Sequence, residues 1–144
     1  MTLTLFENTF VTLNEANNYF NNRPNSDLWT NLSNSEKEQA LQFATIKINC
    51  LPFVGSKLSA NQPLEFPRNF SPQMPNEIKY AVCEEALSVV ENSVHSQNKM
   101  LGISSMTVGS SSVSYTNSDS VNVVISNQAN AFLSKWLAKN FNMN

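Results

Sequence analysis

The chain has 144 residues, the size of one ordinary domain, and its nine Lys and Arg against eleven Asp and Glu give a formal net charge of −2 at pH 7. This balance excludes a general basic field for sequence-independent DNA binding. The sequence contains neither a signal-peptide pattern nor an apolar run of about eighteen residues. We therefore expect a single domain over residues 1–144, made in the cytoplasm and without a membrane span.

The residue types that carry common enzyme chemistry are scarce. His95 is the single histidine, Cys50 and Cys83 lack metal-binding spacing, and three glycines are too few for the familiar phosphate-binding loops. A Ser-His-Asp triad would have to combine His95 with an aspartate from a loop-like segment. We expect no enzyme, no catalytic residue, no cofactor and no metal. A small hydrolase would require His95 for its activity, and His95→Ala without any phenotype would exclude this class.

Residues 1–11 are predicted to be extended, and two helices are predicted to follow. Two pairs have the spacing of a capping box, Thr12 with Glu15 and Ser33 with Glu36. Apolar residues recur at helical spacing after each pair, and the second helix should end at Pro52. Between the two helices, Leu28-Trp29 predicts an apolar anchor.

A long loop between about Pro52 and Pro75 is rich in aromatic residues and prolines. Its apolar side chains are too many to leave in water, so we predict an ordered loop that lays Leu64 and Phe66 on the helices. The residues that define it are Gln62, Leu64, Phe66, Pro67 and Arg68. Arg68 would then face a buried carboxylate, for which Glu85 is the candidate, or the next subunit. That the loop merely plugs the helical bundle is an equal alternative.

The helix predicted from Pro75 onward is apolar on two sides. Its first face carries Ile78, Val82, Ala86 and Val89; its second carries Tyr80, Cys83, Leu87, Val90 and Val94. Such a helix lies at the centre of a bundle or contacts another subunit, so the second face is a candidate subunit interface. Three glutamates seven residues apart, Glu77, Glu84 and Glu91, predict an acidic strip that faces solvent or a lumen.

Residues 102–126 change from helical periodicity to alternation, which predicts an extended arm or a weak hairpin. Val108, Val113 and Tyr115 are its candidate contacts with a neighbouring chain. A last amphipathic helix is predicted from residue 129 to about residue 140. The predicted fold class is therefore mainly α, a small bundle of about four helices with a long ordered loop and a β-like arm before the C-terminal helix.

Three short motifs follow one another in this order: Ala40-Leu41-x-x-Ala44-Thr45, then Gln62-x-Leu64-x-Phe66-Pro67-Arg68, then Pro75-x-x-Ile78-x-x-Ala81. With them, residues 12–140 resemble the head-to-tail connector, adaptor or head completion proteins of tailed bacteriophages. The same pattern is also labelled as a DnaT-like single-stranded-DNA-binding protein. Members often carry Trp before the Pro-Arg pair, and Phe66 in its place keeps the apolar anchor but loses the indole donor.

The resemblance implies a structural virion protein in the neck, a subunit of a homo-oligomeric ring that is commonly a dodecamer. Its implied partners are the portal protein and a tail or second neck protein, with DNA passing through the channel without specific binding. The acidic strip would face that channel, and the arm with Val108, Val113 and Tyr115 would reach the portal or a neighbour. The alternative is a single-stranded-DNA-binding module of a phage or primosome-like complex, distinguished by a steep salt dependence of its affinity.

Overall fold

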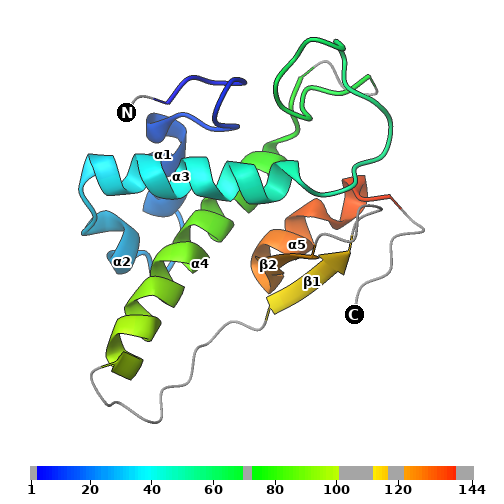
Figure 1. Ribbon diagram of the computed structural model, residues 1–144. Helices are drawn as coiled ribbons and strands as arrows, with labels where there is room; N and C mark the ends of the chain where they lie inside the picture. The colour runs from blue at the N-terminus through cyan, green and yellow to red at the C-terminus, as the bar shows by residue number, and fades with distance from the viewer. Residues whose placement is uncertain (1–2, 70–72, 101–111, 117–121, 139–144) are drawn as a thin grey trace.

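The computed structural model describes residues 3–69, 73–100, 112–116 and 122–138, and of residues 93–100, 112–116 and 122–124 it describes the backbone. In chain order the elements are α1 (Leu13–Asn21), α2 (Asp27–Thr30), α3 (Asn34–Asn49), α4 (Asn76–Met100), β1 (Ser112–Thr116), β2 (Asn122–Ser126), α5 (Asn127–Leu133) and a 3-10 turn, Ser134–Trp136. The long helix α4 runs through the middle, α3 crosses it, and α1 with α2 flanks it opposite the hairpin and α5 (Figure 1). The predicted mainly helical fold class is confirmed.

Both predicted capping boxes are present. The Thr12 hydroxyl accepts a hydrogen bond from the Glu15 amide at 3.1 Å, and the Glu15 carboxylate accepts one from the Thr12 amide at 3.0 Å. Ser33 and Glu36 make the same reciprocal pair at 3.2 and 3.0 Å. Each box satisfies amides that a helix start leaves without partners, so the sequence sets where α1 and α3 begin.

The segment before α1 is a tight turn rather than the extended start that we predicted. The Phe6 amide donates to the Thr9 carbonyl at 2.8 Å, and Phe6 itself adopts a positive φ of 66°. The turn brings Phe10 and Val11 into the core, where both are fully buried. The chain thus folds back before α1, and the two side chains at the end of the turn join the core.

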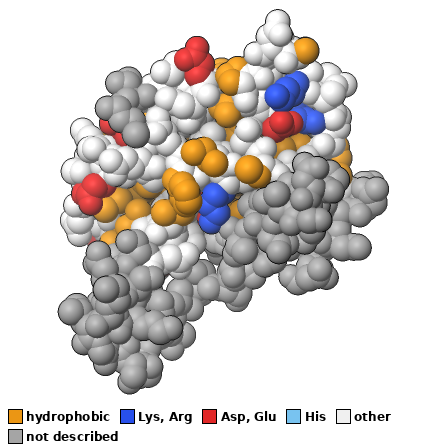
Figure 2. Space-filling model, viewed as in Figure 1, with side chains coloured by type: hydrophobic (Ala, Val, Ile, Leu, Met, Phe, Trp, Pro, Cys, Tyr) orange, Lys and Arg blue, Asp and Glu red, His pale blue; other side chains and the backbone are white. Residues whose placement is uncertain are grey.

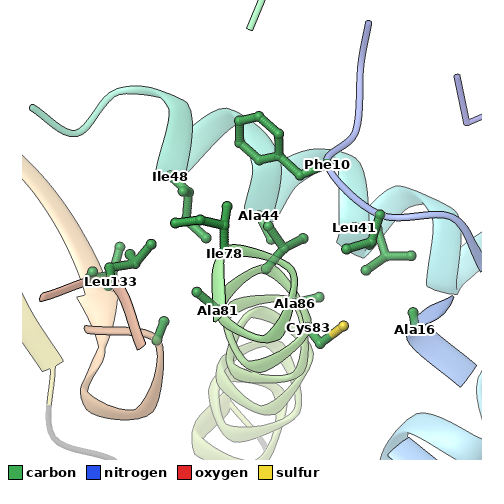
Figure 3. Close-up of a cluster of buried hydrophobic side chains, with 14 of the residues drawn as sticks. Phe10, Ala16, Leu41, Ala44, Ile48, Ile78, Ala81, Cys83, Ala86 and Leu133 are labelled. Atoms are coloured by element: carbon green, nitrogen blue, oxygen red, sulfur yellow. The ribbon is translucent and has the colours of Figure 1, made fainter. Parts of the chain in front are cut away.

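The core surrounds α4. Figure 3 shows side chains projecting from α4 toward its neighbours: Ile78, Ala81, Cys83 and Ala86 from α4, with Leu41, Ala44 and Ile48 from α3, Ala16 from α1 and Leu133 from α5. Every residue of α4 from 81 to 88 is buried. The alternative in which this helix is central to the bundle is therefore the one that the structure supports.

This central position corrects the candidate subunit interface at two residues. Cys83 and Leu87 keep only 1% and 3% of their surface exposed, because α1, α2, α3 and α5 pack around the helix within one chain. Both are therefore core residues of the single chain. Of the remaining members, Tyr80 is exposed, Val90 packs partly against the core, and the side chain of Val94 lies outside the described residues.

The predicted ordered loop is confirmed and is tied down from within. Leu64 and Phe66 are buried, and the Phe66 ring packs edge-on against Phe10 and Phe53 at centroid distances of 5.9 and 4.9 Å. The Gln62 side-chain amide donates to the carbonyls of Leu64 and Pro67, each at 2.8 Å. Gln62 therefore closes the loop on itself, and the Phe66–Pro67 peptide bond inside it is cis.

The C-terminal helix is shorter than predicted. α5 ends at Leu133, and after the 3-10 turn Leu137 pairs with Phe53 in an antiparallel bridge. The Val54 amide donates to the Trp136 carbonyl at 2.8 Å, and the Ala138 amide donates to the Pro52 carbonyl at 3.0 Å. These backbone bonds to the long loop replace the helical ones, which is why the apolar spacing through Leu137 overstated the helix.

The region predicted as an arm or weak hairpin contains a two-stranded antiparallel hairpin. β1 pairs with β2 in the register Val113 with Ile125 and Tyr115 with Val123. Ile125 is buried at 1% exposure and anchors the end of β2 in the core. The side chains of Val113 and Tyr115, and Val108 altogether, lie outside the described residues. Their predicted contacts with a neighbour stay a prediction.

Candidate functional site

A cleft of about 560 Å³ lies between α1 and the first turns of α4. Two tyrosine rings mark it: Tyr19 of α1 stacks on Tyr80 of α4 with ring centroids 5.2 Å apart and planes inclined by 28°. Tyr80 also meets Phe132 of α5 edge-on at 5.6 Å. Although it is held from two sides, Tyr80 leaves 36% of its surface exposed. The cleft thus presents an aromatic ring that is both fixed and accessible.

A buried ion pair fixes the α1 side of this cleft. Arg23 holds the Glu84 carboxylate with both ends of its guanidinium, through Nε at 2.6 Å and Nη2 at 3.1 Å. The Tyr19 hydroxyl donates to the same carboxylate at 2.5 Å. Burial, and then the hydrogen bond to Glu84, raise the pKa of Tyr19; the hydrogen bond to Glu84 raises the pKa of Arg23. The hydrogen bond to Glu84 therefore fixes the orientation of the Tyr19 ring.

This ion pair also corrects the predicted acidic strip. Glu84 has 6% of its side chain exposed, whereas Glu77 and Glu91 are half-buried. A carboxylate can be buried this deeply only with a compensating charge, and Arg23, 61 residues away in the chain, supplies it. The strip is interrupted at its middle residue and does not run continuously along the surface of α4.

The rim of the cleft is polar. Lys79 Nζ lies 2.5 Å from Glu15 Oε2. Burial by itself would raise the pKa of Glu15, but the hydrogen bonds from Lys79 and from the Thr12 amide outweigh it, so the pKa is lowered. Asn18 and Asn76 also line the cleft, both exposed, and within the described part of the chain their side-chain amides make no hydrogen bond. They offer donors and acceptors to a ligand.

A second hollow of about 420 Å³ lies on the other side of the ion pair. It shares Tyr19 and Arg23 with the cleft, and its further lining includes Leu87, Glu84 and Glu91. With two carboxylates against one guanidinium, this hollow is acidic. A polyanion would be repelled from it, so the two hollows differ in what they can accept.

The predicted pairing of Arg68 with Glu85 is wrong. Arg68 stays inside its own loop, where it donates to Glu65 Oε1 at 2.7 Å and to the carbonyls of Val54 and Gly55 at 2.7 and 2.6 Å. Its guanidinium also lies 5.9 Å from the centroid of the Phe66 ring. The buried arginine is therefore the internal support of the loop, in agreement with the alternative in which the loop plugs the bundle.

Glu85 finds different partners. Its Oε2 accepts a hydrogen bond from Lys47 Nζ at 2.5 Å, and its Oε1 accepts one from the Ser126 amide at 2.8 Å. Ser126 ends β2 and caps α5 through its hydroxyl, which accepts from the Ala129 amide at 3.2 Å. One buried carboxylate thus joins α3, α4 and the junction between the hairpin and α5.

Most described positive charges are neutralised. Seven lysines and arginines have described side chains, and five of them, Arg23, Lys47, Lys57, Arg68 and Lys79, are paired with glutamates. The other two, Lys37 and Lys135, lie over the rings of Trp29 and Trp136. The described surface therefore offers a polyanion few uncommitted cations.

The outer face of α3 carries the other prominent surface feature. Phe43 is 51% exposed and Ile46 is 59% exposed, three residues apart on the same side of the helix. Figure 2 shows hydrophobic side chains at the surface over α3. Lys47 beside them pairs with Glu85, and the exposed Glu36, seven residues before Phe43, accepts a hydrogen bond from the Ser33 amide at the start of the helix.

Sequence reasoning named Tyr80 and Cys83 of the cleft, but as members of an interface. It did not single out Tyr19, Arg23 or Lys79. A signal for part of this group exists: Glu15 and Tyr19 are spaced four apart and share one face of α1, whereas Arg23 lies two residues beyond the end of that helix. That spacing shows a shared face, but it does not show that α4 supplies the partners.

The described residues contain no group of His, Cys, Asp and Glu able to hold a metal ion. Among the same residues, no helix is both long and apolar enough to cross a membrane. The fold and the cleft thus define a mainly helical protein whose candidate site is an aromatic cleft with a hydrogen-bonding rim.

A family model described as "Putative DnaT-like ssDNA binding protein" matches residues 5–144, and the chain belongs to this family. Comparison with curated proteins and with solved structures finds no match. The family agrees with the second label of the sequence resemblance, the DnaT-like one. The phage connector label is not confirmed by it.

Proposed function

We propose that this protein binds single-stranded DNA. Membership of a family with that description supports the proposal, and so does the observation that carries it: an accessible tyrosine, Tyr80, held rigidly beside a cleft with hydrogen-bonding groups. Unpaired bases expose flat faces that stack on such rings, and each stacked base contributes about 1–3 kcal/mol. Paired bases in a duplex do not expose these faces.

The charge distribution sets the mode of binding. Because Glu84 and Glu15 already neutralise Arg23 and Lys79 at the cleft, a phosphate would gain little attraction from these two cations. The affinity should therefore come from bases more than from the backbone. Log affinity falls with log salt concentration, and each phosphate contact of a single strand steepens this fall by about 0.7. With at most two such contacts, we expect a slope no steeper than about −1.5. The steep dependence expected from the sequence label is revised accordingly.

Fluorescence anisotropy with a labelled single-stranded oligonucleotide tests this proposal. The same titration with the duplex of the same sequence is the control. We expect saturable binding of the single strand, much weaker binding of the duplex, and a shallow salt dependence for the single strand. Equal affinity for both forms, or no saturable binding of either, would contradict the proposal.

A second candidate is the structural role implied by the sequence resemblance: a subunit of a ring in the virion neck, joined to the portal and to a tail or second neck protein. The observation that favours it is the pair of exposed apolar side chains on the outer face of α3, Phe43 and Ile46. Apolar side chains exposed together mark contact surfaces, and a second copy of the chain would cover these in a ring. Neutralised cations would also let DNA pass without adhering.

Two measurements test the ring. Quantitative mass spectrometry of washed virions should find the protein at a copy number comparable with that of the portal subunit. In solution, Phe43→Ser with Ile46→Ser should lower any self-association seen by analytical ultracentrifugation, whereas the exposed polar change Asn18→Ser should not. Absence from virions would count against this role and leave DNA binding as the remaining candidate.

A further inference from the structure

We propose that the cleft between α1 and α4 holds one unpaired nucleobase, stacked on Tyr80 and contacted at its polar edge by the amides of Asn18 and Asn76. This inference rests on the proposed function and deepens it, because it assigns the ligand class and the residues of the site. The cleft has both parts that a base requires, an apolar surface for its face and hydrogen-bonding groups for its edge.

The aromatic platform is organised before any ligand arrives. Tyr80 is held by the stacked Tyr19 ring on one side and by the edge contact with Phe132 on another. Tyr19 is fixed in turn by its hydrogen bond to Glu84. A ring that is already immobile loses little conformational entropy on binding, so more of the stacking energy contributes to affinity. Tyr19 acts here as a positioning residue.

The polar edge of a base would find uncommitted groups. Asn18 at the α1 side and Asn76 at the start of α4 are exposed, and their side chains have no hydrogen bond within the described residues. A carboxamide carries both a donor and an acceptor, which is the combination that every base presents along its edge. Two further polar residues of the cleft, Glu15 and Lys79, are paired with each other.

The same geometry explains why the base and not the phosphate is the anchor. Arg23 donates hydrogen bonds from Nε and Nη2 to the Glu84 carboxylate, and its Nη1 donates to the Pro24 carbonyl at 2.8 Å. The neighbouring hollow is lined by Glu84 and Glu91 and would repel the strand. A base can enter the cleft without displacing either ion pair, whereas a phosphate would gain little there from cations whose charge is already neutralised.

Two experiments on the full chain test the assignment, and the first uses oligonucleotide affinity. Tyr80→Ala should weaken single-strand binding on the order of tenfold, whereas Tyr80→Phe, which keeps the ring, should bind like the wild type. Phe43→Ala on the outer face of α3 is the matched control, an exposed aromatic outside the cleft, and should change nothing. Asn18→Ala, fully on the surface, should weaken binding several-fold without any effect on folding.

Wild-type affinity from Tyr80→Ala and Asn18→Ala would overturn the cleft assignment and leave the proposed function standing, with its site elsewhere. The second experiment is an NMR titration of the wild type with deoxyadenosine monophosphate. We expect shifts of resonances from Asn18, Asn76 and Tyr80. Absent shifts there would overturn the assignment, whereas a wild type that binds no oligonucleotide would overturn the proposed function, so the two failures are distinguishable.

Discussion

Removal of the Arg68 side chain should destabilise the whole protein, because this residue is the internal support of the long loop. Arg68 is 4% exposed, and its guanidinium donates to Glu65 Oε1 and to four carbonyls, those of Phe53, Val54, Gly55 and Glu65. In Arg68→Ala, the buried Phe53 carbonyl and the part-buried carbonyls of Val54 and Glu65 would lose this donor. The side chain also packs against two aromatic rings, which would lose that contact.

The magnitude follows from these contacts. Removing one partner of a fully buried charged pair costs about 3–5 kcal/mol, and the lower end applies here because Glu65 is 28% exposed; each unsatisfied buried carbonyl costs about 1–3 kcal/mol. We expect the free energy of unfolding to fall by about 4 kcal/mol. For a chain of this length, that corresponds to a fall in melting temperature of about 15 °C. Arg68→Lys should lose less, because it keeps the charge but not the forked geometry.

Urea denaturation followed by circular dichroism measures this loss. Lys57→Ala is the matched control, because Lys57 also pairs with Glu65, at 3.8 Å, but is 34% exposed. A pair this open to solvent should contribute at most about 0.5 kcal/mol. If Arg68→Ala stayed within about 1 kcal/mol of the wild type, water would be satisfying the loop carbonyls, and the role of Arg68 as an internal support would be refuted.

Three other predictions follow from burial and charge. Burial raises the pKa of the Cys83 thiol, so a thiol reagent at pH 8 should modify the exposed Cys50 quickly and Cys83 only after unfolding; rapid reaction of both in the native protein would contradict this. Leu87→Glu should unfold the chain, read as loss of the cooperative thermal transition, whereas a folded variant with altered assembly would restore Leu87 to an interface. Because the pKa of Glu15 is lowered by folding, its stabilising effect is present above about pH 4.5 and is lost as pH falls through the lower folded-state pKa. Glu15→Gln should therefore lose less melting temperature than the wild type between pH 6 and pH 3, and parallel curves would refute this.

Local signals in the sequence were sufficient for much of the fold. The two capping boxes depend on residues three apart, so the spacing of Thr12 with Glu15 and of Ser33 with Glu36 already determines them. The loop was predictable for a different reason: Leu64 and Phe66 had to be buried somewhere, which excluded a solvated loop. The change to alternating periodicity over residues 102–126 predicted an arm or a weak hairpin, and the two strands lie within that range.

Partner choice was not predictable, because it depends on tertiary geometry. Glu84 is paired with a residue 61 positions away, and Glu85 with one 38 positions away, and nothing in the spacing of either glutamate identifies Arg23 or Lys47. The second face of α4 had the same apolar pattern whether it packed against its own chain or another. Only the positions of α1, α3 and α5 decide that Cys83 and Leu87 are core residues.

Competition between backbone partners accounts for the C-terminal error. The apolar residues through Leu137 have helical spacing, and two structures fit that pattern. One is a single long helix, and the other is a short helix followed by an apolar residue that packs against the core. The bridge between Leu137 and Phe53 decides between them, and its partner strand lies in a loop more than eighty residues earlier. No local pattern contains that information.

Single-strand binding through Tyr80 is tested most directly by the affinity of the wild type and of Tyr80→Ala for one single-stranded oligonucleotide. Fluorescence anisotropy at low and at physiological salt measures it. If an unpaired base stacks on Tyr80, the wild type should bind saturably with a shallow salt dependence, and Tyr80→Ala should lose affinity on the order of tenfold. Steep salt dependence with no effect of the substitution would contradict the base-stacking mode. No binding by the wild type would contradict the proposed function itself.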